Sequence, residues 1–335
     1  MPFAHDLLTW YQKNRRHLPW RENPTSYFVY LSETMLQQTR VDTVIPYFEA
    51  FTQNYPSFLA LSKANEEEIL ARWQGLGYYS RARNLLAAAK IIAERYAGEL
   101  PNDHEALLSL PGVGEYMASA VLAIAFNQPY VAVDGNLLRV YSRLEAKNID
   151  VSRAKDRQEC GAFFAQRMES PSDFNQALMD LGELVCLPHG APKCECCPLK
   201  SSCKAFAQGN PEEYPPKKKK AAVKEEELTV LLLFDAKGRI AIRKRPDKGL
   251  LASLYEFPNV AGHHGLCDLT RLFPGVKDFA YLGEETHRFS HVLWKMKVYV
   301  GSGAMKGWLS APLEEIGARY SLPTAFFKLL EKPAK

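Results

Sequence analysis

Apolar positions recur with a helical period through the first 203 residues, and they alternate with polar positions only further along the chain. A spacing of three to four residues places apolar side chains on one face of a helix, whereas a spacing of two places them on one face of a strand. The segments with helical spacing are 3–11, 65–73, 81–96, 116–126, 156–168 and 174–185. Because no convincing alternation appears before residue 203, the pattern predicts an all-helical first domain.

Polar residues beside these segments indicate where helices begin. Asn65, followed three residues later by Glu68, has the arrangement of a capping box and predicts a helix start. In the run 27–38 we expect Ser32 to cap a helix whose first turn holds Glu33, where the helix dipole favours a carboxylate. On this pattern alone Glu33 is an ordinary first-turn acid.

The apolar period changes beyond a segment rich in proline and charge. This segment, 208–227, contains the consecutive lysines Lys217 to Lys220 and predicts an extended linker. Strand-like alternation follows in 228–234, 239–245 and 294–300, and helical patterns return near 313–318 and 323–330. We therefore predict a multidomain protein, with a helical domain over 1–207, the linker over 208–227 and an α+β domain over 228–335.

Two glycines flank a single small residue immediately before the apolar segment 116–126. In Leu110-Pro111-Gly112-Val113-Gly114 they let the backbone approach a ligand closely and present amide groups at a helix start, which suits a phosphate oxygen. This is a helix-hairpin-helix signature. The same five residues also fit an ordinary tight turn between packed helices.

Composition permits a nucleic-acid partner without requiring one. The chain has 335 residues and a formal net charge of +4, which suggests two or three domains with a mild basic excess. Its start lacks the pattern of a secretion signal, and no apolar run is long enough to span a bilayer. We expect a soluble, cytoplasmic monomer that makes no membrane contact.

Most of the seven cysteines gather near the end of the helical part. Cys194 and Cys197 have the two-residue spacing that lets neighbouring thiolates share a metal site, and Cys186 and Cys203 lie close enough to complete a set of four. A zinc ribbon would show two closely spaced pairs, whereas only one is present here. An iron–sulfur cluster therefore fits better, with Cys196 as a spare.

Several short blocks together point to a known family. The blocks are Leu18-Pro19-Trp20-Arg21, Ser32-Glu33, Met35-Leu36-Gln37-Gln38-Thr39, Gln74-Gly75-Leu76-Gly77-Tyr78-Tyr79, Leu110-Pro111-Gly112-Val113-Gly114 and Val133-Asp134-Gly135-Asn136. In their identity and order they resemble the endonuclease III superfamily of DNA glycosylases and, within it, the MutY-type adenine DNA glycosylases. The resemblance covers nearly the whole chain. It implies a helix-hairpin-helix glycosylase domain that binds double-stranded DNA and carries a [4Fe-4S] cluster on the four cysteines.

The resemblance also implies the roles of particular residues. Glu33 would be the general acid that protonates the departing adenine, and Asp134 the carboxylate that stabilises an oxocarbenium-like sugar, by analogy with O-glycoside hydrolysis. Tyr116 and Asn136 would line the sugar side of the pocket. The remaining substrate and DNA contacts would come from Trp20, Arg21, Leu36, Gln38, Thr39, Leu76, Tyr78, Gly112, Gly114 and Gln176. Among these, Gln38 and Tyr78 would form the wedge that enters the minor groove as the base is flipped out.

Tyr116 bears on the type of reaction. Relatives that nick the strand through a Schiff base carry a lysine two residues after the second hairpin glycine, because an amine must attack the sugar. Here Gly114 is followed by Glu115 and Tyr116. We therefore expect a monofunctional glycosylase that leaves an abasic site. The alternatives are an endonuclease III-like glycosylase and lyase for oxidised pyrimidines, and a catalytically silent lesion-binding or redox-sensing protein.

The C-terminal part resembles the MutT-like domain of the same enzymes, through Arg245-Pro246, Gly249-Leu250-Leu251 and Leu254-Tyr255-Glu256-Phe257-Pro258. It lacks the glutamate-rich box that binds metal in nucleotide pyrophosphohydrolases, so we expect no hydrolysis by this domain. Phe289, Ser290 and His291 resemble the loop that reads 8-oxoguanine opposite the target adenine. The resemblance therefore implies an enzyme of base excision repair that removes adenine mispaired with 8-oxoguanine or guanine.

Overall fold

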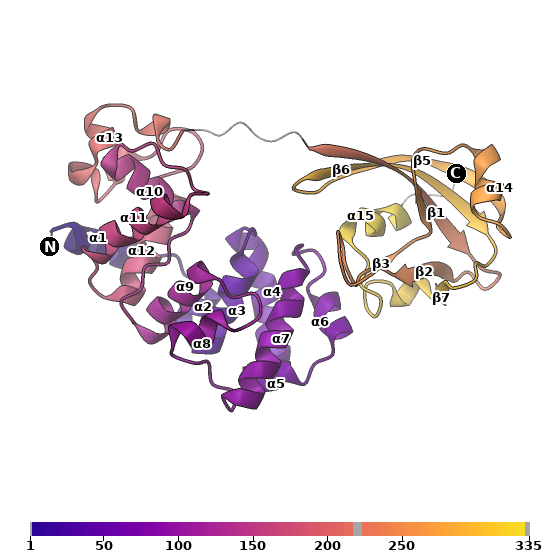
Figure 1. Ribbon diagram of the computed structural model, residues 1–335, viewed down its shortest axis with the longest axis horizontal. Coiled ribbons are helices and arrows are strands. Elements are labelled where there is room, and N and C mark those ends of the chain that lie inside the picture. The colour runs from indigo at the N-terminus through magenta and orange to yellow at the C-terminus, as the bar shows by residue number, and fades with distance from the viewer. Residues whose placement is uncertain (1, 217–222, 332–335) are drawn as a thin grey trace. The chain divides into compact units, whose positions relative to one another are not determined.

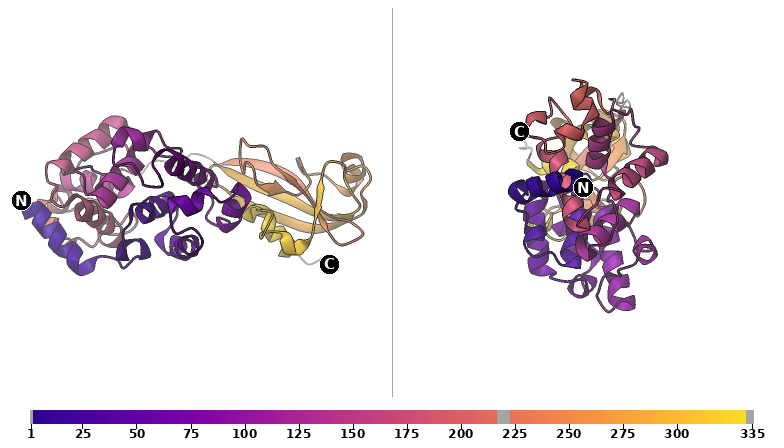
Figure 2. Two further views of the ribbon diagram at one scale, coloured as in Figure 1. Left: turned by 90° about the horizontal axis from the view of Figure 1, so that it is seen from below. Right: turned by 90° about the vertical axis from the view of Figure 1, so that its left-hand side faces the viewer.

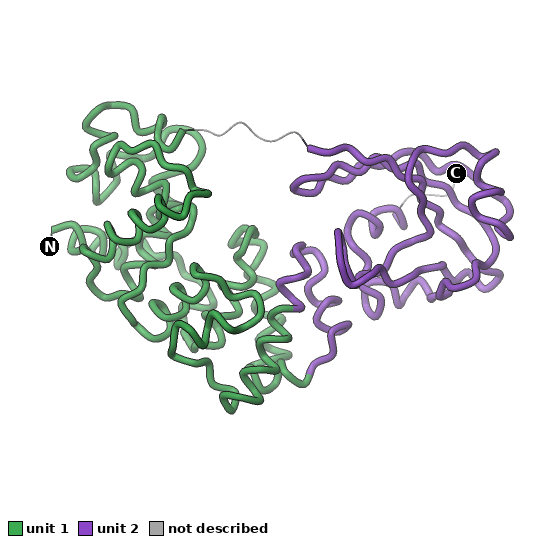
Figure 3. The backbone as a smooth tube through the Cα atoms, viewed as in Figure 1, with its two compact units in different colours: residues 1–63, 84–219 green, residues 64–83, 220–335 purple. Residues whose placement is uncertain are grey.

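The computed structural model describes residues 2–216 and 223–331. The chain divides into two compact units, one of residues 1–63 and 84–219 and the other of residues 64–83 and 220–335 (Figure 3). The lysines Lys217 to Lys220 of the expected linker lie outside the described residues. Within the described ranges, no helix has the length and hydropathy needed to cross a membrane.

The first unit is helical, as the apolar spacing predicts. Its α-helices are α1 Pro2–Asn14, α2 Pro19–Glu22, α3 Ser26–Leu36, α4 Val41–Asn54, α5 Phe58–Ser62, α7 Ser80–Arg95 (which begins in the second unit), α8 His104–Leu108, α9 Glu115–Phe126, α10 Gly135–Glu145, α11 Ala154–Ala165, α12 Pro171–Leu184 and α13 Lys204–Ala207. Short 3-10 turns are η1 Cys194–Cys196, η2 Lys200–Ser202 and η3 Pro211–Glu213. Figure 2 shows these helices from two further sides, with no strand between residues 2 and 216.

The central helix of the first unit is α9. Its side chains from Met117 to Ala123 are buried except for Ser119, which is only partly so, and the helix contacts both α3 and α12. A helix that is apolar on every side must be surrounded by others, because any exposed face would leave apolar area in water. The same core helix therefore positions α3, which carries Glu33, and α12, which carries Gln176.

The expected cap at Ser32 is wrong. The cap of helix α3 lies seven residues earlier, at Thr25, whose side chain accepts a hydrogen bond from the Phe28 amide at 3.1 Å, and the helix begins at Ser26. The Ser32 hydroxyl instead donates to the Val29 carbonyl at 3.0 Å, within the helix. The run from Tyr27 to Met35 is buried almost throughout, so it has no one-sided apolar stripe from which a helix could be recognised.

The second unit contains α6 Glu66–Arg72 and a seven-stranded sheet (Figure 1). The Asn65 side chain accepts a hydrogen bond from the Glu68 amide at 2.8 Å, which confirms the predicted start of α6. The strands are β1 Lys224–Phe234, β2 Ile240–Lys244, β3 Tyr255–Glu256, β4 Asn259–Ala261, β5 Lys277–Arg288, β6 Val292–Ser302 and β7 Leu309–Ala311. The main strand order is β3-β2-β1-β6-β5, with β4 paired to β1 and β7 to β2. Strands β1 and β6 are parallel, and the other pairs are antiparallel.

Alternation along β1 supplies two cores, one on each face of the sheet. Val230 and Leu232 belong to a cluster with Phe326 of α15 Thr324–Phe327, whereas Leu231 and Leu233 belong to a cluster that includes residues of α14 Leu266–Leu272. Successive side chains of a strand point to opposite faces, which explains the division. Two 3-10 turns, η4 Leu313–Glu315 and η5 Lys328–Glu331, complete the unit. The α+β prediction is confirmed, although the helix expected over 313–318 is only the turn η4.

Candidate active site

Glu33 lies in a cavity of the first unit with a volume of about 260 Å³. Its side chain belongs to α3 and is 7% exposed. Four further residues singled out from the sequence line the same cavity: Trp20, Arg21, Leu36 and Gln176. These residues come from α2, α3 and α12, so the fold brings together positions that are up to 156 residues apart in the chain. The cavity has room for a small bicyclic ring.

The environment of Glu33 favours its protonated form. Burial raises the pKa of its carboxyl group to about 7, and the nearby negative charge of Asp134 acts in the same direction. The Tyr116 hydroxyl donates a hydrogen bond to Glu33 Oε2 at 2.7 Å, and this bond and the charge of Arg21 hold the pKa lower than burial alone would. Glu33 can therefore hold a proton near neutral pH, as a general acid must.

Asp134 occupies the start of α10 as its N-cap. Its Oδ1 accepts a hydrogen bond from the Leu137 amide at 2.7 Å, and its Oδ2 accepts one from Asn136 Nδ2 at 2.9 Å. Burial raises the pKa of Asp134, while these hydrogen bonds and the charge of Arg139 act against that rise. The donors that surround Asp134 suit a carboxylate, whereas Glu33 receives one hydroxyl donor.

A chain of hydrogen bonds runs from Asp134 to the cysteine-rich segment. Asn136, which contacts Asp134, accepts a hydrogen bond from Arg139 Nη2 at 2.8 Å, and Arg139 Nε donates to the Cys186 carbonyl at 2.8 Å. Gly182 permits close packing here, because a Cβ atom at this position would lie 2.7 Å from Asn136 Cβ. The orientation of Asp134 is thus tied to the packing of α10 on α12.

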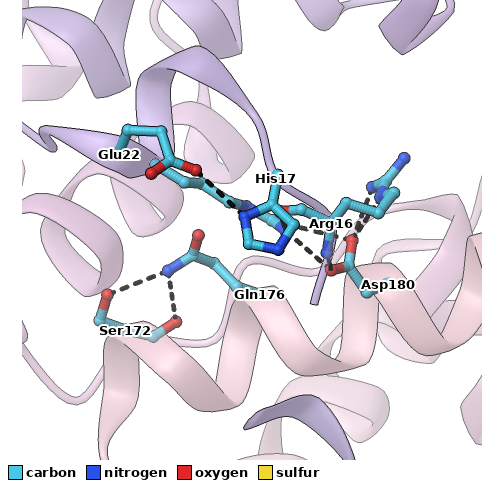
Figure 4. A network of polar contacts seen from close by, with 7 residues as sticks. Arg16, His17, Glu22, Ser172, Gln176 and Asp180 are labelled. Atoms are coloured by element: carbon cyan, nitrogen blue, oxygen red, sulfur yellow. Dashed lines mark hydrogen bonds and ion pairs between the residues drawn. The ribbon is translucent and has the colours of Figure 1, made fainter. Parts of the chain in front are cut away.

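Gln176, which lines the same cavity as Glu33, is held by its own helix. Its side-chain nitrogen lies 3.3 Å from the Ser172 hydroxyl and 3.4 Å from the Ser172 carbonyl, to which it donates (Figure 4). These bonds leave the amide oxygen of Gln176 available to a ligand in the cavity. His17 and Glu22 form an exposed pair at 3.3 Å near the same opening.

The two hairpin glycines have different surroundings. Gly112 has a φ of +80°, and a Cβ atom there would lie 2.7 Å from Asn84 Cβ, so only glycine fits. Gly114 is the N-cap of α9 with a φ of −115°, and a Cβ atom there would meet nothing within 4 Å. The space beside Gly114 and the free amides at the start of α9 suit an anionic oxygen.

Comparison with known proteins agrees with this geometry. The profile of the HhH-GPD superfamily base excision DNA repair proteins matches residues 31–164, and that of the NUDIX domain matches residues 229–332. The chain is 34% identical to an adenine DNA glycosylase of Buchnera aphidicola (subspecies Baizongia pistaciae), over 87% of this chain and 83% of that protein. The chain belongs to the adenine DNA glycosylase family.

Other similar proteins extend the comparison. The human adenine DNA glycosylase is 33% identical over 95% of this chain and 70% of its own length. For the adenine DNA glycosylase of Arabidopsis thaliana the identity is 37%, but the chain spans only 46% of that protein. A solved thermostable thymine-DNA glycosylase matches 62% of this chain and 95% of its own, with a TM-score of 0.56 and 28% identity. A non-covalent endonuclease III–DNA complex shares the fold at 21% identity, with a TM-score of 0.53 over 62% of this chain and 94% of that one.

In this member of the adenine DNA glycosylase family, the four predicted cysteine ligands line one small cavity. They are Cys186, Cys194, Cys197 and Cys203. Arg143 Nη1 lies 3.1 Å from Cys186 Sγ, which places a positive charge beside the thiol set. Among the described residues, no group of three or more His, Cys, Asp or Glu side chains is close enough to hold a single metal ion. Four thiols around one cavity match the donor set that a [4Fe-4S] cluster requires.

Two further groups of predicted residues meet inside the second unit. Phe289, Ser290 and His291 form the turn between β5 and β6, which the Phe289 amide closes by donating to the Val292 carbonyl at 2.8 Å. Together with Leu76 and Tyr78 they line a cavity of about 610 Å³. The hydroxyl groups of Tyr78 and Ser290 are hydrogen-bonded to each other.

Gln38 and Thr39 line neither of these cavities. They follow the last turn of α3, where Gln38 is exposed with a φ of +61° and Thr39 is half-buried. A positive φ is uncommon for a residue other than glycine, and here it occurs in the turn that follows α3.

Sequence reasoning missed the residue that supports the Tyr78 loop. Arg81 is 6% exposed, and its Nη2 donates to the carbonyls of Leu76 and Gly77, each at 3.1 Å. Trp73 Nε1 also donates to the Gly77 carbonyl at 3.1 Å, and the Arg81 guanidinium lies 5.7 Å from the centre of the Tyr78 ring. The only signal in the sequence was an arginine three residues after Tyr78, next to a glycine-rich loop.

Proposed function

We propose that this enzyme removes adenine that is mispaired with 8-oxoguanine or guanine in duplex DNA, and that it leaves an abasic site. The observation that carries the proposal is the buried Glu33 carboxyl, with a pKa raised to about 7, in the wall of a cavity that accommodates a base. The names of the relatives support adenine as the base and DNA as the polymer.

Glu33 acts as the general acid. Breaking the bond between adenine and the sugar leaves electrons on the purine, and a proton from Glu33 lets the base depart as a neutral molecule. Water then adds to the anomeric carbon and loses a proton, which completes the hydrolysis. Trp20, Arg21, Leu36 and Gln176 surround the adenine in this scheme, consistent with their places in the cavity.

Asp134 is the ionised carboxylate that faces the sugar. The loss of the base builds positive charge on the sugar ring, which a nearby negative charge stabilises. The hydrogen bonds from Leu137 and Asn136 to Asp134 support this assignment, because they favour the carboxylate over the acid. Tyr116 contributes by orienting Glu33.

Base flipping precedes this chemistry, because neither carboxyl can reach a stacked base. The hairpin at Gly112 and Gly114 holds a phosphate, while Gln38 and Tyr78, assisted by Thr39 and Leu76, occupy the gap that the base leaves. The open space beside Gly114 and the exposure of Gln38 and Tyr78 support these roles.

The reaction stops at the abasic site. A tyrosine at position 116 has no amine with which to attack the sugar, and its hydroxyl is hydrogen-bonded to Glu33. We expect DNA strands to break only after alkali or heat is applied to the product. Prompt nicking at neutral pH would instead favour a glycosylase and lyase.

Ser290 and His291 read the base opposite adenine. Both are exposed at the tip of the β5–β6 turn, while the Phe289 ring packs on Trp294 with centroids 4.9 Å apart and anchors the turn. Hydroxyl and imidazole groups can hydrogen-bond the altered edge of 8-oxoguanine, which an apolar tip could not do.

The cysteine-rich segment holds a [4Fe-4S] cluster on Cys186, Cys194, Cys197 and Cys203. When bound, such a cluster would fix this segment in its folded form. Iron and sulfide analysis of the purified protein tests this, with Cys203→Ser as the variant that should lose iron. Exposed Cys196, which lies outside the cavity, provides the matched control as Cys196→Ser.

Single-turnover release of free adenine tests the whole proposal. Duplexes would carry adenine opposite 8-oxoguanine, guanine or thymine. We expect rapid release opposite 8-oxoguanine, slower release opposite guanine and none opposite thymine. Tight binding of the lesion with no release from any duplex would favour the catalytically silent alternative.

A further inference from the structure

Asp180 is a fully buried carboxylate that the catalytic scheme does not use. It lies in α12, one turn beyond Gln176, and its exposed fraction is 0%. Its two oxygen atoms accept hydrogen bonds from Arg16 and Arg21, which precede Asp180 by 164 and 159 positions in the chain. Figure 4 shows the contact between Arg16 and Asp180. A buried charge is costly unless it is paired, so this group needs its partners to be tolerated.

Two arginines supply those partners. Arg16 Nε and Nη2 each lie 2.7 Å from Asp180 Oδ1. Arg21 Nη1 lies 2.7 Å from Oδ2, and Arg21 Nη2 lies 3.2 Å from Oδ1. Arg21 therefore binds the carboxylate in a bidentate manner through both terminal nitrogens. This is the geometry in which arginine pairs most strongly with a carboxylate.

Asp180 also holds the backbone that carries these arginines. The Arg16 amide donates to Asp180 Oδ2 at 3.2 Å. The loop from Arg15 to Leu18 has no regular structure, and α2 that follows it is four residues long with no side-chain cap. Such a short, uncapped helix depends on outside contacts for its place. The buried carboxylate thus fixes a segment that includes Trp20.

Arg16, Arg21 and Trp20 all line the cavity that contains Glu33. The positive charge of Arg21 lowers the pKa of Glu33, and the negative charge of Asp180 lies between the two guanidinium groups. The other groups whose charges or hydrogen bonds act on Glu33 are Tyr116 of α9 and Asp134 at the start of α10. The remaining charged or ionisable residues of the cavity wall are Tyr11, Arg15, His17, Glu22 and Asp173.

We infer that Asp180 is a positioning residue for adenine release: it locks Arg16 and Arg21 into the cavity wall and cancels part of their charge beside Glu33. This inference rests on the proposed function. Without Asp180 the two guanidinium groups lose their anchor, and the field at Glu33 becomes more positive. A more positive field favours the carboxylate of Glu33, so its acid form is lost at a lower pH.

Asp180→Asn tests the inference, because it removes the charge while keeping the shape. In single-turnover assays we expect the rate to fall, and the pH above which it declines to move down by about 0.5–1 unit. A protein that had only become less stable would lose rate without this movement. The exposed Glu183, on the same helix and outside the cavity, gives the matched control Glu183→Gln.

A measurement that needs no turnover separates this inference from the proposed function. NMR of 13C-carboxyl-labelled glutamate, with Glu33→Gln to assign the resonance, gives the pKa of Glu33 directly. We expect a lower pKa in Asp180→Asn, and a higher one in the double variant Asp180→Asn, Arg21→Gln, which also removes a positive charge. This titration tests Asp180 even if the wild-type enzyme releases no adenine.

Two further variants, Arg21→Gln and Asp180→Glu, test the inference if Asp180→Asn does not fold. Removing the Arg21 charge should raise the pKa of Glu33, and Asp180→Glu, which keeps the charge, should leave that pKa closer to its wild-type value than Asp180→Asn does. An unchanged Glu33 titration in Arg21→Gln, or in folded Asp180→Asn, would overturn the inference. So would a pH–rate profile of Asp180→Asn that coincides with that of the wild type.

Discussion

The proposed role of Glu33 sets two requirements: the carboxyl must hold a proton at neutral pH, and it must release that proton during the reaction. An acid catalyst needs a proton at neutral pH, and burial supplies it by raising the pKa of Glu33 to about 7. The Tyr116 hydroxyl, 2.7 Å from Oε2, then keeps the buried carboxyl hydrogen-bonded in either charge state. The residue is thus suited to give up its proton during the reaction without being left unpaired.

The pH dependence of adenine release follows from this arrangement. The proposed mechanism needs Glu33 as the acid and Asp134 as the carboxylate. The single-turnover rate should therefore fall about tenfold per unit above a pH of about 7, where Glu33 loses its proton, and it should also fall at low pH, where Asp134 takes one up. Tyr116→Phe removes a hydrogen bond that lowers the pKa of Glu33, so the decline should begin at a higher pH in that variant. A decline that begins at the same pH in both proteins would mean that another group controls it.

Replacing Glu33 should separate adenine release from DNA binding. Glu33→Gln cannot donate the proton, and we expect adenine release to fall by about 10²–10⁴-fold while DNA binding persists. Turnover equal to that of the wild type would remove Glu33 from the mechanism.

The same variant should be more stable at alkaline pH. The folded protein holds the Glu33 proton more tightly than the unfolded chain, so folding stability decreases as pH rises from about 4.5 to about 7. Glu33→Gln is spared this loss, which amounts to up to about 3 kcal/mol. Thermal unfolding at pH 5 and pH 8 should therefore show a higher Tm for the variant at pH 8 and a smaller difference at pH 5.

At the scale of secondary-structure elements, two helix N-termini carry residues of the proposed mechanism. Asp134 is the N-cap of α10, and Gly114 is the N-cap of α9. The N-terminus of a helix offers unpaired amides and a positive potential, which stabilise a carboxylate in one case and suit a phosphate in the other.

The hairpin glycines should respond differently to alanine. Gly112→Ala forces a side chain into the left-handed region and against Asn84, so we expect a loss of about 1–3 kcal/mol in folding stability. Gly114→Ala has neither problem, and its Tm should match that of the wild type. If Gly114 lies against a phosphate, Gly114→Ala should still weaken DNA binding. Full binding by Gly114→Ala would exclude a close backbone approach there.

The sequence predicts an element best when the element buries one face and exposes the other, because its apolar and polar residues then follow a regular period. Helices such as α7 have an apolar face and a polar face, and the predicted segment 81–96 differs from Ser80–Arg95 by one residue at each end. Helix α3 is buried around most of its surface, so its start was misplaced. Strand β5 was missed because it is an edge strand and none of its side chains is fully buried.

Candidate functional residues could be picked out from the sequence where short motifs contain them, but not where residues distant in the sequence come together. The blocks around Glu33, Asp134 and Ser290 led to the candidate site, because each motif is contiguous in sequence. Asp180 and Arg81 were not found. Their importance comes from the groups that they hold, and for Asp180 these lie more than 150 residues away.

At the scale of the whole molecule, residues 64–83 group with the C-terminal residues and not with their neighbours in sequence. Arg83 Nη1 donates to the Ala252 carbonyl at 2.8 Å, and Lys244 lies 3.5 Å from Glu67. The loop that carries Tyr78 thus belongs to the same compact unit as the Ser290 turn. In the proposed mechanism, selection of the opposite base and occupation of the gap in the duplex therefore fall to the same unit.

This grouping predicts that Tyr78 and Ser290 act together in lesion preference. Ser290→Ala should reduce the ratio of the rate opposite 8-oxoguanine to the rate opposite guanine by about two- to tenfold, since one hydrogen bond contributes about 0.5–1.5 kcal/mol. Tyr78→Phe removes the hydroxyl bonded to Ser290 and should lower the same ratio.

Because the two side chains touch, the double variant should lose less than the product of the single losses. Thr286→Ala, an exposed change on β5 outside the cavity, should leave the ratio unchanged. Strictly multiplicative losses would mean that Tyr78 and Ser290 contact the DNA independently. The turn between β5 and β6 would then act without the Tyr78 loop, even though both belong to one compact unit.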